Sequence, residues 1–221
     1  YLPRVKKIKT RYIDHLAATC RLLQGTADRP GLYLSEEDEI YKVYYARRRI
    51  SRSAWRVPAV RFAKNSRNLR RLGISAPIAK AVYHYPPRRM HIVLYNRLPG
   101  DDLRESARRD PESLASTGPF LAHLHKRGVH FRGIHLGNVL VGDDGLGLID
   151  IADLTVRSSP LLPTTRARNV AHLLNHPADA EALLRYGRGR LVREYLEAAS
   201  LVTWAERIFQ WQLRIGLAGP L

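Results

Sequence analysis

The chain has 221 residues, enough for one large domain or two small lobes, and its 45% hydrophobic content excludes global disorder. Lysine and arginine number 37 against 20 aspartate and glutamate residues, and the net charge of +17 favours an anionic partner, either a nucleic acid, a membrane surface or a phosphorylated glycolipid. The single cysteine, Cys20, excludes an intramolecular disulfide. The sequence contains no run of about 18 apolar residues that would predict a membrane-spanning helix.

The first half of the chain predicts a sheet with one helix. Strands are expected at residues 31–35, 39–48, 74–85 and 88–98, and a helix at residues 58–73. The second strand alternates in character, which places Lys42 and Val43 on opposite faces of the sheet. The helix has apolar residues on one side and is expected to end at Gly73.

The second half predicts mainly helices. They are expected at residues 110–128, 165–175, 178–187 and 189–216, and a hairpin of two short strands is expected at residues 138–150. The first of these helices has a capping signal at Asp110, and the hairpin turns at an Asp-Gly pair. A strand-rich half followed by a helical half predicts an α+β chain with two lobes.

Five stretches, in this order, carry a resemblance to a known family: "IYKVYYARRRISRSA", "RFAKNSRNLRRLGISAP", "LYNRLPGDDL", "FRGIHLGNVL" and "LGLIDIADL". Together they resemble the protein-kinase-like superfamily, and more narrowly the lipopolysaccharide core kinases and their relatives, including bacterial "toluene tolerance" proteins. The resemblance implies a bilobal protein-kinase-like fold. Its parts would be a small β-rich lobe at residues 1–97, a hinge at 98–102, and a larger helical lobe at 103–221 with the catalytic and metal loops.

The resemblance assigns ATP and Mg²⁺ to particular residues. Lys42 matches the strand lysine that binds the phosphates, and Asn138 and Asp150 match the amide and the carboxylate that hold Mg²⁺. A hairpin between Asn138 and Asp150 could fold both onto one metal. Asp153 is a candidate for a second cation or for a helix cap.

Three departures from the family pattern concern catalysis. The aspartate that would accept the proton of the acceptor hydroxyl is replaced by Gly133, and the histidine before it is Phe131. The helix position that usually offers a glutamate to the lysine is Asn65. The glycine-rich phosphate loop is poorly supported, with only Gly25 and Gly31 flanking its expected turn.

For several other residues the sequence allows two possible roles. His135 matches a histidine that is usually structural, but it is also the nearest candidate for a replacement base. Arg132 could bind an anionic substrate or be a simple surface residue. The run Arg47, Arg48 and Arg49 fits a solvated face or a contact with anionic headgroups.

Three aromatic residues near the end of the sequence, Trp204, Phe209 and Trp211, fit either a buried seam or an interfacial helix. Buried packing is the expected role. The first residue is Tyr1 rather than methionine, so the sequence does not fix where the protein begins.

The leading interpretation is ATP-dependent phosphoryl transfer to a hydroxyl of a lipopolysaccharide core sugar, heptose or Kdo, during envelope biogenesis. The expected partner is an anionic glycolipid, and the expected location is the cytoplasm or the inner face of the inner membrane. The alternative is a catalytically impaired pseudokinase that acts as a nucleotide-binding or scaffold protein in envelope assembly or solvent tolerance. A nucleic-acid partner is not expected, because no recognised binding motif accompanies the charge.

Overall fold

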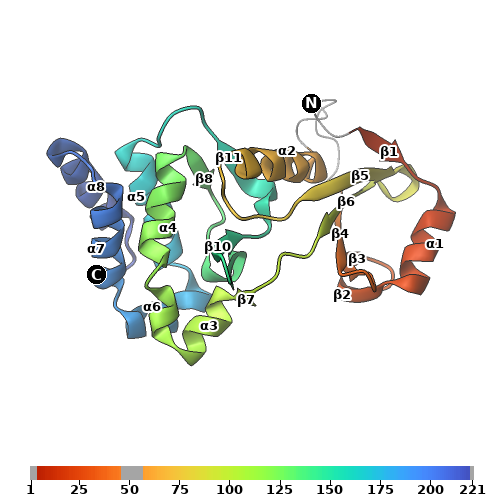
Figure 1. Cartoon of the computed structure of the whole chain (residues 1–221), viewed down its shortest axis with the longest axis horizontal. Helices are drawn as coiled ribbons and strands as arrows, with labels where there is room; N and C mark the ends of the chain where they lie inside the picture. The colour runs from red at the N-terminus through yellow and green to blue at the C-terminus, as the bar shows by residue number, and fades with distance from the viewer. Residues whose placement is uncertain (1–3, 46–56, 220–221) are drawn as a thin grey trace. The chain divides into compact units, whose positions relative to one another are not determined.

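The computed structural model of the chain describes residues 4–45 and 57–219 (Figure 1). It divides into two compact units: a first unit of Tyr1–Leu98 with Asp150–Asp153, and a second unit of Pro99–Ile149 with Leu154–Leu221. The predicted fold class, an α+β chain with a sheet-rich N-terminal part and a mainly helical C-terminal part, is confirmed. The hinge role of residues 98–102 stays a prediction.

The first unit is built on a six-stranded sheet with the strand order β1-β5-β6-β4-β3-β2. Its strands are β1 (Val5–Lys7), β2 (Arg21–Gly25), β3 (Pro30–Leu34), β4 (Glu39–Tyr45), β5 (Ala79–Tyr85) and β6 (Met90–Asn96). Its helices are α1 (Thr10–Thr19) and α2 (Pro58–Arg71), with the short 3-10 helices η2 (Pro86–Arg88) and η5 (Ile151–Asp153). All neighbouring strands are antiparallel except β1, which runs parallel to β5.

The sequence did not predict β1 or α1. Helix α1 was not predicted because the usual sequence signals of a helix start are missing. Its N-cap is Lys9, which makes no side-chain capping bond, and its first turn has no acidic residue. The helix is held by packing instead, because Leu16 is buried in a cluster with Val43 and Ile92.

The predicted alternation along β4 is confirmed. Val43 lies in the cluster that α1 covers, whereas Lys42 belongs to the opposite face of the sheet. On that opposite face α2 packs through Phe62, which is fully buried and stacks on the ring of Tyr95 with centroids 4.8 Å apart. The sheet therefore lies between two helices, and Lys42 is on the side of α2.

The second unit contains most of the helices. They are α3 (Leu103–Arg109), α4 (Thr117–Lys126), α5 (Pro163–Leu174), α6 (Ala180–Tyr186), α7 (Arg188–Ala199) and α8 (Thr203–Gly216), with η3 (Pro111–Leu114), η4 (Leu136–Asn138) and η6 (Pro177–Asp179). Its short strands are β7 (Asp101–Asp102), β8 (Val129–Phe131), β9 (Val139–Gly142), β10 (Gly145–Leu148) and β11 (Leu154–Val156). Helix α4 packs against α7, and α5 packs against α8.

The predicted hairpin is present as the antiparallel pair β9–β10. The segment expected to be helical at residues 189–216 is two helices, because Ser200 adopts a left-handed backbone conformation with φ of 47° and ends α7. Phe209 is fully buried and stacks on Tyr195, as expected. The prediction of buried packing is wrong for Trp204 and Trp211, which are 64% and 62% exposed.

Candidate functional site

Two predicted site residues meet within the first unit. Lys42 lies in the middle of β4, and its Nζ is 2.7 Å from Oδ1 of Asp150. The lysine side chain is 18% exposed and the aspartate side chain is 46% exposed, so both charges border on solvent. A cation that suits phosphate and a carboxylate that suits Mg²⁺ are therefore side by side.

The backbone of Asp150 has φ of 53°, a left-handed conformation that is uncommon for residues other than glycine. Asparagine and aspartate tolerate it best, and such residues cluster at functional sites when the surroundings hold them in place. Here the surroundings are part of the same unit. The buried side chain of Asn65 on α2 donates from Nδ2 to the carbonyl oxygen of Ile151 over 2.7 Å.

Asp153, the candidate for a second cation, forms an ion pair with Arg61 of α2. The side chains of Arg61 and Asp153 are 41% and 70% exposed, so solvent screens the pair and it contributes little to stability. A metal at Asp153 would have to displace this guanidinium. Asp150 is likewise paired, with Lys42, so the ion pairs alone do not favour one of the two carboxylates over the other as a metal ligand.

Tyr44 lies two residues along β4 from Lys42, and the lysine Nζ lies 5.8 Å from the centre of its ring. Burial and then the charge of Asp150 raise the pKa of Tyr44, so its hydroxyl stays protonated. This buried hydroxyl has no hydrogen-bond partner among the described residues. An unpaired buried hydroxyl near a lysine and a carboxylate fits a polar ligand at this place.

The turn between β2 and β3 occupies the position expected for the phosphate loop. Gly25 has φ of 95°, and a Cβ there would collide with the backbone of Arg29 and Gly31. Thr26 and Arg29 close the turn with a pair of backbone hydrogen bonds of 3.2 and 3.1 Å. The glycine is thus needed by the turn itself, and a role toward phosphate stays a prediction.

Gly133 and Asn138, the other central residues of the prediction, belong to the second unit. Asn138 donates from Nδ2 to the carbonyl oxygen of Gly133 over 3.0 Å, and its backbone carbonyl accepts from the amide of Ile149. The side-chain bond uses the amide nitrogen, so it does not consume the oxygen that a metal would need. That Asn138 shares a metal with Asp150 stays a prediction.

His135 stands in a polar cluster that the sequence did not predict. Its Nδ1 accepts from Nη2 of Arg104 over 3.1 Å, and its ring stacks on that of His176 with centroids 4.6 Å apart. Burial, His176 and Arg104 lower the pKa of His135, so the ring is neutral near pH 7. A neutral ring that accepts at Nδ1 carries its proton on Nε2, so the one nitrogen that could take up a proton is the one that Arg104 contacts. The base role of His135 stays a prediction.

Asp179 is the anchor of this cluster. It is completely buried, forms an ion pair with Arg104, and accepts from the backbone amide of Leu136 through Oδ2 over 2.8 Å. Nδ1 of His176 lies 3.3 Å from Oδ2 of the same carboxylate. Sequence reasoning missed Asp179 because it lies in the first turn of the helix expected at residues 178–187, where an acidic residue is common.

A second buried network fixes the strand before Gly133. Asn169 donates from Nδ2 to the carbonyl oxygen of Phe131 over 2.8 Å, and its Oδ1 accepts from Nε2 of His125 over 3.1 Å. The hydroxyl of Tyr195 donates to Nδ1 of His125 over 2.9 Å. Burial lowers the pKa of His125 to about 3, so it is a neutral structural residue.

The remaining predicted residues fall outside these networks. Arg132 is an exposed residue after β8. Arg47, Arg48 and Arg49 lie outside the described residues. In the described part of the chain, no group of three or more histidine, cysteine, aspartate or glutamate side chains could hold a metal. No described helix is long and apolar enough to cross a membrane.

No protein-family model matches the chain, and no curated protein matches it. A solved structure described as WaaP in complex with acyl carrier protein is 20% identical, covers 91% of each chain and has a TM-score of 0.49. Two structures of WbdD are 17% and 18% identical and cover 83% and 74% of this chain, with TM-scores of 0.44 and 0.43. The matched parts are 48% and 43% of the WbdD chains, so this chain spans about half their length.

Proposed function

We propose that the chain is a protein-kinase-like protein related to the lipopolysaccharide core kinases, which holds ATP with Mg²⁺. The observation that carries this proposal is the contact between Lys42 and Asp150. Phosphoryl transfer depends mainly on positioning and on neutralising phosphate charge. The lysine would bind phosphate oxygens, and the aspartate would hold the metal.

The donor set suits Mg²⁺. This ion usually takes one or two carboxylates and completes its shell with phosphate oxygens and water, so a dense acidic cluster is not required. Asp150 supplies one exposed carboxylate, and Asn138 is the proposed second protein ligand. The acceptor would be a hydroxyl of an anionic core glycolipid, heptose or Kdo, met at the inner face of the inner membrane. The net charge of +17 and the exposed Arg132 support an anionic acceptor.

Without a carboxylate at Gly133, transfer by this chain would be slow. A positioned base is typically worth about 10²–10⁴-fold in rate, so its loss weakens transfer without abolishing it. Positioning by Lys42 and Asp150 would supply the remaining acceleration.

A second candidate function is a pseudokinase that binds nucleotide and acts through partners. Two observations favour it. Gly133 offers no side chain for proton transfer, and Asn65 bonds to the backbone of Ile151 where an active kinase would offer an acid to the lysine. This alternative keeps the nucleotide site of the first proposal and omits the transfer step.

The first test is calorimetry of ATP binding with and without Mg²⁺, on the wild-type chain and on Asp150→Asn. The expected result is Mg²⁺-dependent binding that weakens at least tenfold in the variant, because changes around a metal ligand already cost about 10–100-fold. Asp144→Asn is the matched control: this exposed aspartate lies in the β9–β10 turn, and its loss should leave binding unchanged.

The outcomes separate the two candidate functions. Binding followed by transfer of labelled phosphate to lipopolysaccharide core oligosaccharides supports the kinase, whereas binding without transfer to these acceptors supports the pseudokinase. Absence of binding at millimolar nucleotide, or equal binding by Asp150→Asn, would refute both.

A further inference from the structure

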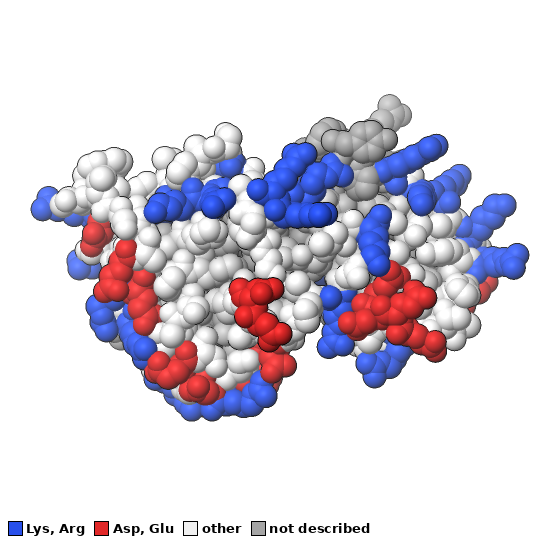
Figure 2. All heavy atoms as spheres, viewed as in Figure 1, with Lys and Arg blue, Asp and Glu red and all other residues white. Residues whose placement is uncertain are grey.

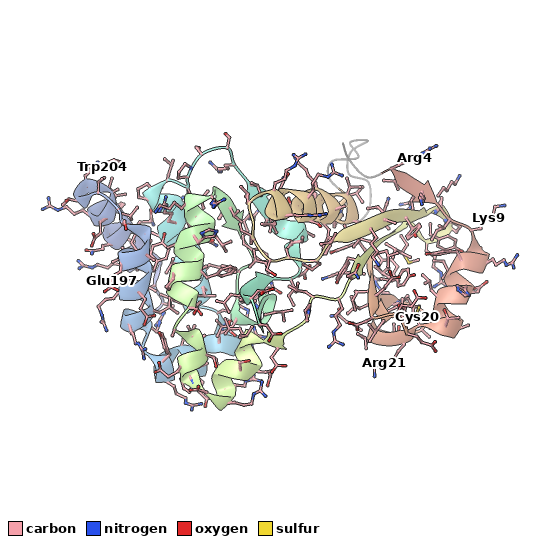
Figure 3. All side chains as sticks on the ribbon, in the orientation of Figure 1. Arg4, Lys9, Cys20, Arg21, Glu197 and Trp204 are labelled. Atoms are coloured by element: carbon pink, nitrogen blue, oxygen red, sulfur yellow. The ribbon has the colours of Figure 1, made fainter. Side chains whose placement is uncertain are left out.

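Helix α8 carries an apolar stripe on its outer side. Trp204, Ile208, Trp211 and Ile215 follow one another at intervals of four, three and four residues, which places them on one face of a helix. They are 64%, 38%, 62% and 61% exposed. The opposite face of α8, with the buried Phe209, provides the packing that holds the helix in the second unit. Figure 3 shows the labelled Trp204 at the outer edge of α8. We call these four residues the α8 stripe.

The α8 stripe is more than scattered surface hydrophobicity. Single exposed apolar residues are normal on soluble proteins, but a contiguous patch marks an interaction site. The described residues include ten exposed large hydrophobic side chains, and four of them lie in the α8 stripe. Two of the four are tryptophans, which are highly buried on average in folded proteins, whereas Trp204 and Trp211 are more than 60% exposed.

Basic residues border the α8 stripe on both sides. Arg207 and Arg214 are exposed on α8 and lie along one border. The other border carries Arg168 of α5, which is exposed and donates from Nη2 to Oε1 of Gln212 over 3.4 Å. Glu206, the one acidic residue of α8, is turned away from the stripe and accepts from Gln210. The border of the stripe on α8 and α5 is therefore positive.

We propose that the α8 stripe docks onto the surface of an anionic lipid bilayer. An amphipathic helix with tryptophan on its apolar face and arginine beside it lies in the plane of the membrane interface, with its apolar face below the headgroups. Arginines near the surface add attraction to anionic lipid. In the view of Figure 2, residues other than lysine, arginine, aspartate and glutamate cover much of the end of the second unit that carries α8, with basic and acidic side chains beside them.

Charge also argues against a second copy of the chain as the occupant. Two copies that paired through this face would bring Arg207, Arg214 and Arg168 of each chain together, and each copy has a net charge of +17. Such like-charge pairing is unfavourable, whereas an anionic bilayer neutralises the same residues. The proposal is independent of the proposed phosphoryl transfer, because lipid binding can be measured without nucleotide.

The test is sedimentation of the full chain with vesicles of phosphatidylcholine alone or mixed with phosphatidylglycerol. We expect binding to the mixed vesicles that weakens as salt is raised. The double variant Trp204→Gln and Trp211→Gln should bind about tenfold more weakly or worse, because it removes the two largest apolar anchors. Leu184→Gln is the matched control: it changes an equally exposed apolar residue, on α6, and should bind as the wild type does.

The charge component has its own pair of variants. Arg207→Gln with Arg214→Gln should weaken binding by about fivefold for each arginine, since each contributes about 1 kcal/mol near an anionic surface. Arg70→Gln with Arg71→Gln removes the same charge from the exposed end of α2 in the first unit and should change binding far less.

Three results of the vesicle experiments would overturn the proposal. They are unchanged binding by the tryptophan variant with an intact circular dichroism spectrum, equal binding to neutral vesicles, and a larger loss from the α2 pair than from the α8 pair. A self-association that the tryptophan variant abolishes, with no vesicle binding, would also overturn it and identify a second copy as the occupant.

Discussion

Restoring a carboxylate at position 133 tests the proposed reason for slow chemistry. The structure has room for it: a Cβ built on Gly133 meets only Cε2 of Phe131, at 3.9 Å, an ordinary contact distance. The backbone of Gly133 is also outside the left-handed region that would demand glycine. Gly133→Asp is therefore expected to fold.

The expected change in stability is small. Replacing glycine where the backbone suits other residues reduces the entropy of the unfolded chain and stabilises by about 0.4–1 kcal/mol. The midpoint of thermal unfolding should therefore stay within about 4 °C of that of the wild type. If a missing base limits transfer, the variant should transfer phosphate about 10²–10⁴-fold faster.

The assay is transfer of labelled phosphate from ATP to lipopolysaccharide core oligosaccharides, with ATP binding measured in parallel. Gly133→Asn is the matched control, because it adds the same volume without a group that accepts a proton near pH 7. A rate gain in Gly133→Asp that Gly133→Asn lacks is the expected result. Equal rates in the two variants, or no transfer by a variant that still binds ATP with Mg²⁺, would refute the reasoning.

Three further predictions concern the stability of the folded chain. Burial lowers the pKa of His125 to about 3, so as the pH falls this histidine is protonated in the unfolded chain before it is protonated in the folded one. The free energy of unfolding should therefore be about 2 kcal/mol lower at pH 5 than at pH 7. In urea titrations, His125→Gln should lack this loss. Asp179→Asn removes a fully buried charge from its pair with the partly buried guanidinium of Arg104 and should cost about 3 kcal/mol, with faster hydrogen exchange at the amide of Leu136; unchanged protection there would contradict it. Gly25→Ala should destabilise more than Gly145→Ala in thermal unfolding, since both glycines have positive φ but only Gly25 has no space for a Cβ.

The predictions that were confirmed rest on short local sequence patterns. The alternation along β4 placed Lys42 and Val43 on opposite faces, because side chains in a strand have a period of two. The hairpin β9–β10 followed from an Asp-Gly turn between two apolar runs. Each of these signals is contained in a few consecutive residues.

The parts that the sequence did not predict depend on partners far along the chain. Asn65 bonds to Ile151, and Asp179 bonds to the amide of Leu136, and no local periodicity links such positions. The prediction that the two tryptophans of α8 are buried failed for a different reason. Their spacing indicates only that they share a helix face, and which face is buried depends on the helix against which α8 packs.

The division of the chain gives the segment Asp150–Asp153 a particular meaning. It lies in the second half of the sequence, yet it belongs to the first unit. There Lys42 pairs with Asp150, Asn65 donates to the carbonyl of Ile151, and Arg61 pairs with Asp153. The proposed metal-binding carboxylate is thus fixed to the strand that carries the proposed phosphate-binding lysine.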